Sequence, residues 1–183
     1  MAVLTWIVVI IVVVVLFVIF LFNRLVQLRN EVKNSWAQID VQLKRRFDLI
    51  PNLVKSVKGY MKHEKGLLTE ITRQRTAVMQ AASLAGKAKA SGKLSDAIRS
   101  LLVNVENYPQ LRASENVMQL QEELTGTENK IAYSRQHYND IVMLFNNRIQ
   151  VFPNNMIAGM LGFKEHELFE TSEAEKKPVH VEL

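Results

Sequence analysis

The sequence contains no cysteine. Disulfides, a lipid-modified cysteine anchor, thiolate metal ligands and a cysteine nucleophile are therefore excluded. The phosphate-binding motifs G-x-x-x-x-G-K-[ST] and G-x-G-x-x-G and the nucleophile motif G-x-S-x-G are also missing. His63-Glu64 is followed by Lys65-Gly66-Leu67, so the second ligand of an H-E-x-x-H site is absent. We expect no metal, no cofactor and no enzymatic reaction.

Charge is absent from Val3 to Phe22, the twenty residues VLTWIVVIIVVVVLFVIFLF. At about 1.5 Å per residue a helix of this length crosses the roughly 30 Å hydrocarbon core of a membrane. A cleaved signal peptide has a positive start and small residues at its cleavage site, whereas here bulky residues run directly into Asn23-Arg24. We therefore predict a permanent transmembrane anchor over residues 1–23.

Cations follow this segment closely. Only Met1 and Ala2 precede it, while Arg24, Arg29 and Lys33 come after it. This bias predicts a single-pass protein with its N-terminus outside and its C-terminal domain in the cytoplasm. The three cations lie within about 17 Å of Phe22 along a helix, so we expect them to contact anionic lipid head groups.

Two long apolar seams follow the anchor, and each predicts a helix that packs nearly parallel or antiparallel to another. The first contains Leu25, Leu28, Val32, Trp36, Ile39, Leu43, Phe47, Ile50, Val54, Val57 and Met61. The second contains Val117, Leu120, Leu124, Ile131, Tyr138, Ile141 and Phe145, with Thr127 and Ser134 at the two remaining steps. Leu49, Leu53, Leu67, Met79 and Met143 fall off these seams, which suggests apolar surface available to a partner.

The remaining boundaries follow from local chemistry. Residues 81–96, rich in Ala, Ser, Gly and Lys, predict a turn or a frayed helix end, with a short helix restarting near Ser95. Ser114 is a plausible cap for the second long helix, which should run to about Val151. A brief helix should follow, with Gly162 just past its end. We place the bundle domain at 24–170 and a flexible tail at 171–183.

Pro51 allows two interpretations. Asp48 caps a new helix that has Pro51 in its first turn, or the first long helix continues with a kink. The seam keeps its step from Phe47 to Ile50 to Val54, which favours continuation.

Three consecutive cations, Lys44, Arg45 and Arg46, precede this proline. On an upright helix Lys44 lies about 33 Å from Phe22, beyond the screening length of about 8 Å. Arg46 has no acidic partner at helical spacing. The cations form either an ordinary solvated face, or a contact with lipid or with the acids Glu122, Glu123 or Glu128 of a neighbouring subunit.

Three segments carry a family resemblance: RNEVKNSWAQIDVQLKRRFDLIPNLVKSVKGYMKHE (29–64), ENVMQLQEELTGTENKIAYSRQHYNDIVMLFNNRIQVFP (115–153) and FKEHELFE (163–170). On these segments the chain resembles the LemA family of bacterial membrane proteins. The resemblance implies an antiparallel bundle of long helices on one transmembrane helix of the bacterial cytoplasmic membrane. It also implies a non-enzymatic protein linked to envelope integrity and encountered with a heat-shock membrane metalloprotease.

Nucleic-acid binding is not expected despite a pI near 9.5, because aromatic residues are not interleaved with the cations. We predict a membrane-anchored helical scaffold that forms homo-oligomers and organises or remodels the membrane. The alternative is an adaptor or sensor for a membrane quality-control metalloprotease. The residues expected at a subunit or partner contact are Lys44, Arg45, Arg46, Pro51, Glu122 and Glu123.

Overall fold

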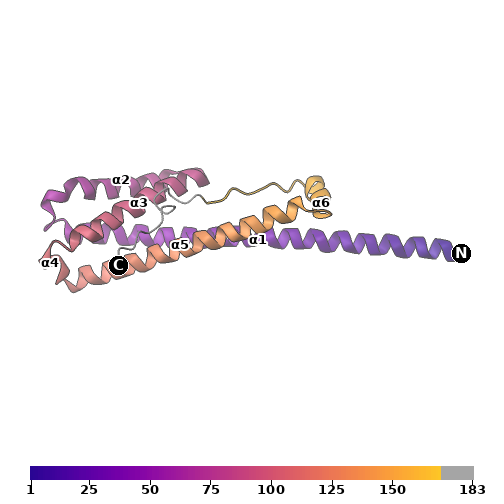
Figure 1. Ribbon diagram of the computed structural model, residues 1–183, viewed down its shortest axis with the longest axis horizontal. Helices are drawn as coiled ribbons and strands as arrows, with labels where there is room; N and C mark the ends of the chain where they lie inside the picture. Colours follow the sequence, from indigo (N-terminus) through magenta and orange to yellow (C-terminus); the bar gives the residue numbers. More distant parts are fainter. Residues whose placement is uncertain (170–183) are drawn as a thin grey trace, which may run out of the picture. The chain divides into compact units, whose positions relative to one another are not determined.

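The computed structural model describes residues 1–169, and each regular element in that range is a helix. Along the chain the elements are α1 (Ala2–Val57), η1 (Lys62–Glu64), α2 (Lys65–Gln80), α3 (Leu84–Val105), α4 (Pro109–Arg112), α5 (Glu115–Gln150) and α6 (Asn154–Leu161) (Figure 1). The prediction of an all-α fold with an apolar N-terminal helix is confirmed. The predicted tail at 171–183 lies outside the described residues.

The chain divides into two compact units. Unit 1 contains Met1–Gln38 and Gln136–Leu168, and unit 2 contains Ile39–Arg135 together with Phe169. Helices α1 and α5 each contribute one part to each unit. The domain boundaries predicted from the sequence, at residues 23 and 170, stay predictions.

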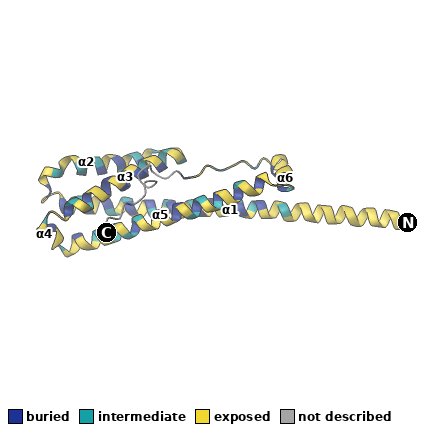
Figure 2. Cartoon of the chain, viewed as in Figure 1, coloured by how far each residue is buried: buried dark blue, intermediate teal, exposed yellow. Residues whose placement is uncertain are grey.

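The first part of α1 is the segment that is long and apolar enough to cross a membrane. Every residue from Val3 to Phe20 is exposed, as the continuous yellow stretch at the N-terminal end of Figure 2 shows. A helix that is apolar on all sides and buried on none is suited to lipid rather than to water. Within residues 1–169, its length, composition and exposure fit one membrane span.

Helix α1 passes through Pro51 without interruption, which confirms the continuation favoured from the sequence. It ends at Val57, however, so the prediction of one helix that continues to Met61 is wrong. Gly59 lies in the turn after α1, and Gly66 is in the first turn of α2. The apolar spacing continued because the turn places Met61 in the same core as Val57, with both side chains fully buried.

The prediction of a turn or frayed end at 81–96 is also wrong, because α3 begins at Leu84. The Ser83 hydroxyl accepts a hydrogen bond from the backbone N–H of Gly86 at 3.1 Å and caps the helix. Apart from Leu94, the buried face of this part of α3 consists of small residues, namely Ala88, Ser91, Gly92 and Ser95. A search for bulky apolar positions does not detect such a face.

Helix α5 agrees with its prediction. It starts at Glu115, directly after Ser114, and ends at Gln150. Most of the predicted seam is buried: Val117, Leu124, Thr127, Ile131, Ser134, Tyr138 and Phe145. Gly162 follows α6 with a φ of 71°, a left-handed conformation that closes the helix as predicted.

The core of unit 2 lies among α1, α2, α3 and α5. Its buried members include Ile50, Leu53, Ile71, Leu94, Ile98, Leu101 and Leu124, and Figure 1 shows α2 and α3 side by side. Leu53 was expected to be apolar surface but is 1% exposed, because α2 and α3 supply partners that a two-helix arrangement lacks. Leu49 and Leu67 pack partly against the same core. Met79 and Met143 are exposed, as expected.

In unit 1, the extended segment after α6 packs along α5. The Phe163 ring lies 6.3 Å from that of Phe145, and the Asn146 side chain both donates to the His166 carbonyl and accepts from the His166 N–H, each at 2.9 Å. The Tyr138 hydroxyl donates to the Glu167 carbonyl at 3.1 Å. Phe163 thus anchors this segment on α5, whereas Leu168 is exposed.

Candidate functional site

A buried polar cluster joins α1, α3 and α5 inside unit 2. The Arg46 guanidinium is fully buried and donates to Glu128 Oε1 at 2.9 Å, to Ser95 Oγ at 3.0 Å and to Ser91 Oγ at 2.6 Å. Ser95 in turn donates to Glu128 Oε2 at 2.6 Å. The two Nη atoms of Arg46 thus bond to a carboxylate and two hydroxyls inside the core, whereas its buried Nε has no hydrogen-bond partner among the described residues.

A second arginine joins the same cluster. Arg135 of α5 is 5% exposed, and its Nη2 donates to Ser91 Oγ at 2.6 Å. Its guanidinium lies over the ring of Phe169, 4.8 Å from the ring centre. Ser91 therefore accepts hydrogen bonds from two cations. The cluster ties three helices of unit 2 together.

The expectation that Arg46 lies on a solvated face or at a subunit contact is wrong. The guanidinium has no exposed surface, and its acidic partner Glu128 belongs to the same chain. The acid is 82 residues away along the chain, so helical spacing within α1 did not indicate it. Sequence reasoning also missed Arg135, Ser91 and Ser95. The available signal was a set of small residues at helical spacing between 88 and 95.

The other two cations of the run lie at the surface. Lys44 is exposed, and the Arg45 side chain is half exposed and lies 3.7 Å from Glu123 Oε2. They line a shallow groove of about 530 Å³ together with Val41, Asp48, Leu49, Asn52 and Glu123. We call this surface the α1 groove. It brings together three of the six residues predicted at a partner contact: Lys44, Arg45 and Glu123.

The other predicted residues lie apart from these three. Pro51 and Glu122 are exposed but do not line the α1 groove. In unit 1, Arg24 and Lys33 are exposed, as a head-group contact requires. Arg29 is partly buried, and its guanidinium lies 5.3 Å from the centre of the Phe163 ring. Lipid contact by these three cations stays a prediction.

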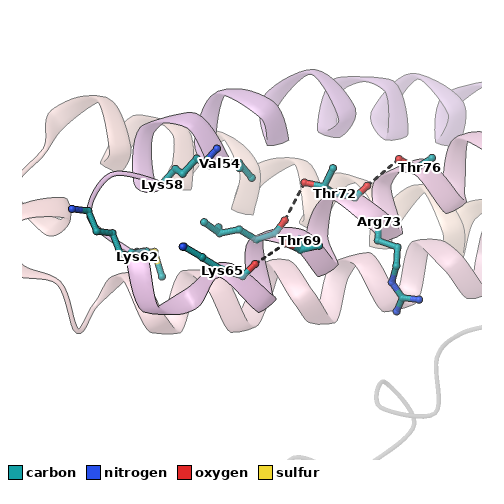
Figure 3. A pocket seen from close by; sticks show the side chains of 10 residues that line it. Val54, Lys58, Lys62, Lys65, Thr69, Thr72, Arg73 and Thr76 are labelled. Carbon is teal, nitrogen blue, oxygen red and sulfur yellow. Dashed lines mark hydrogen bonds between the residues drawn. The ribbon is translucent and has the colours of Figure 1, made fainter.

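A larger groove, of about 820 Å³, lies between the end of α1 and helix α2 (Figure 3). Its apolar lining is Val54, Met61 and Leu68, and its basic lining is Lys58, Lys62, Lys65 and Arg73. Arg73 forms a salt bridge with Glu70 at 2.8 Å, and hydrogen bonds from Arg73 and Gln74 hold the pKa of Glu70 below its usual value. The groove combines apolar surface with positive charge.

The hydroxyl groups that line this groove bond to the backbone of α2. Its remaining lining residues are Thr69, Thr72 and Thr76, and the dashed lines in Figure 3 show that each hydroxyl donates to the backbone carbonyl four residues earlier. None of the ten lining residues is a histidine, a carboxylate or a cysteine.

The described histidines lie apart. His63 is exposed in η1, His137 is on α5 and His166 is in the extended segment, while His180 lies outside the described range. No group of three or more potential metal ligands comes together within residues 1–169.

Comparison with known proteins identifies relatives of this chain. The LemA family model matches residues 35–183. Protein LemA of Metamycoplasma hominis is 29% identical over 158 residues, which cover 86% of this chain and 72% of the relative. Magnetosome protein MamQ 2 of Paramagnetospirillum magneticum is 24% identical, with 86% and 68% covered. Magnetosome protein MamQ of Magnetospirillum gryphiswaldense is 23% identical with the same coverage.

Proposed function

Because this chain belongs to the LemA family, we propose that it is a membrane-anchored scaffold whose copies associate through the α1 groove and so organise or remodel the bacterial membrane. The observation that carries the proposal is the composition of that groove. Val41, which is 62% exposed, lies there beside two cations and two acids. An apolar centre with a charged rim is typical of protein interfaces.

The charges of the groove favour a second copy of the same chain as the partner. A two-fold contact uses the same patch on both copies, so the patch must complement itself. Lys44 and Arg45 supply positive charge, and Asp48 and Glu123 supply negative charge within the same groove. Such a patch meets its own complement when it is rotated by half a turn.

The relatives and the span support action at a membrane. Proteins of similar sequence are named for the magnetosome, and the uncharged start of α1 is a membrane span. We propose the cytoplasmic membrane, with the N-terminus outside, because Arg24, Arg29 and Lys33 all follow the span. Anionic head groups near these cations would add about 1 kcal/mol each at contact. We also propose that the role is non-enzymatic.

Self-association is tested by replacing Val41 with Glu in the full-length protein. Buried charge at a subunit contact is costly, so we expect Val41→Glu to shift the particle to a smaller mass in light scattering and in blue-native electrophoresis in mild detergent. Val103→Glu is the matched control, because Val103 is 59% exposed on α3 and should leave the mass unchanged. A wild-type protein of strictly monomeric mass would rule out the scaffold.

The identity of the partner is tested by crosslinking. A photoreactive residue at position 44, next to the apolar centre of the α1 groove, should capture a second copy of the chain in intact cells. Capture of a membrane metalloprotease without any self-crosslink would replace the scaffold with the adaptor. The same residue at position 93, exposed on α3, is the control for random encounters.

A further inference from the structure

The segment from Val151 to Phe163 contains no charged residue. It includes α6, which is buried on one side at Ile157 and Ala158. Its other side is also apolar, with large side chains exposed at Phe152 (73%), Met156 (61%), Met160 (85%) and Leu161 (55%). A helix next to water normally presents polar residues on its free side. The exposed side of this segment therefore requires a different environment.

Contacts within unit 1 place this segment beside the end of the membrane span. Phe163 follows Gly162 directly, and its ring lies 6.4 Å from that of Phe22, the last residue of the apolar run. The Arg29 guanidinium lies 5.3 Å from the centre of the same ring. The exposed apolar side of α6 is thus close to the level at which α1 leaves the hydrocarbon core.

We propose that α6 is a second membrane contact of this protein, which lies in the interface of the bilayer that the span crosses. Phe152, Met156, Met160 and Leu161 insert at the boundary between head groups and acyl chains, as in interfacial amphipathic helices. Lys164, exposed just after the segment, lies at the level of the head groups and favours anionic lipid. The occupant is lipid because Phe163 connects this surface directly to the end of the span.

This inference depends on the membrane span but not on self-association. A protein that stays monomeric can still insert α6, and a scaffold can form without it. The two proposals therefore fail in different experiments.

The absence of cysteine makes a direct depth measurement feasible, because one introduced thiol is the single labelling site. A spin label is attached to Met156→Cys and Met160→Cys variants of the full-length protein. Each variant is reconstituted at one protein copy per nanodisc, in a bilayer of phosphatidylglycerol and phosphatidylcholine. Collision rates with oxygen and with a water-soluble nickel chelate give the depth of each label. Met79→Cys is the matched control, because Met79 on α2 has the same exposed fraction of 61% as Met156.

We expect both α6 labels to lie about 5–10 Å below the lipid phosphates, with frequent oxygen collisions and few nickel collisions. The label at Met79, and a second control at Val103 on α3, should collide freely with nickel. A label at Phe20 within the span gives the fully inserted reference. Nickel collisions at Met156 and Met160 as frequent as those at Met79 would overturn the proposal. Protection from both reagents would also overturn it, because it would show that protein covers α6.

Discussion

The carbonyl oxygen of Phe47 accepts a hydrogen bond from Nε of Arg75 at 3.1 Å. In a regular helix this carbonyl would accept from the N–H of residue 51, but that residue is a proline and has no N–H. Helix α2 therefore supplies the donor that α1 lacks. The proline is tolerated because a neighbouring helix compensates for it.

This compensation predicts coupling between positions 51 and 75. Arg75→Met should destabilise the protein by about 1.5–3 kcal/mol, the usual range for a hydrogen bond that involves a charged group. The cost should be smaller by about 1 kcal/mol in a Pro51→Ala background, because the new N–H can bond to the Phe47 carbonyl. Denaturant unfolding of the four full-length variants in detergent, followed by circular dichroism, measures the cycle.

Arg73→Met is the control for this cycle. Arg73 is on the same helix, but its side chain is 69% exposed and pairs with Glu70, so its loss should change the stability much less than the loss of Arg75 in either background. Equal effects of Arg75→Met with and without Pro51 would show that the hydrogen bond does not depend on the proline.

The adjacent residues Arg45 and Arg46 should contribute very different amounts to the stability of the protein. Arg46→Ala leaves Glu128 without its buried partner and should destabilise the protein by about 3–5 kcal/mol. Arg45→Ala removes a side chain that is 50% exposed from a 3.7 Å ion pair and should cost less than about 1 kcal/mol. Denaturant midpoints measured in the same detergent compare the two. Similar losses for both variants would contradict the buried position of Arg46.

Gly162 should be sensitive to substitution and Gly159 should not. Gly162 has a φ of 71°, so Gly162→Ala forces a side chain into a left-handed conformation at a cost of about 1–2 kcal/mol. Gly159 is inside α6 with open space where a Cβ would be, so Gly159→Ala should stabilise the helix by up to about 1 kcal/mol. Hydrogen exchange of the Phe163 amide, which bonds to the Ala158 carbonyl, should become faster in the first variant and slower in the second. A change in the same direction in both would contradict this account of the helix end.

His166 should make the protein sensitive to acid. Burial lowers the pKa of its imidazole, and the cations Lys33 and Arg29 lower it further. The unfolded chain, with an ordinary pKa of about 6.5, then binds more protons than the folded chain below that pH, so acidification favours unfolding. As the pH falls, the loss of stability begins near pH 6.5 and is complete below the lowered pKa of His166.

Thermal melting of wild type and His166→Gln from pH 8 to pH 5 measures this loss. The variant should lose less stability on acidification, whereas His63→Gln, at an exposed position, should follow the wild type. A wild-type acid response that persists in full without His166 would assign it to other groups.

Local chemistry explains which features could be predicted. The start of α5 after Ser114, its end at Gln150 and the glycine after α6 depend on residues within a few positions of each boundary. The break after Val57 and the helix from Leu84 could not be predicted, because Met61 preserves the apolar spacing across a turn and small residues form the buried face of α3. Lys44, Arg45 and Glu123, three of the residues predicted at a partner contact, line the α1 groove, and Arg46 does not.

The sequence by itself determined the membrane span, the helical class and the two seams, because each depends on runs or spacings of apolar residues along the chain. The tertiary structure alone decided the environment of the three consecutive cations. Lys44 and Arg45 point to the surface, whereas Arg46 is enclosed by Ser91, Ser95 and Glu128. The physical reason is that a buried charge requires partners in three dimensions, and these partners lie 45, 49 and 82 residues away.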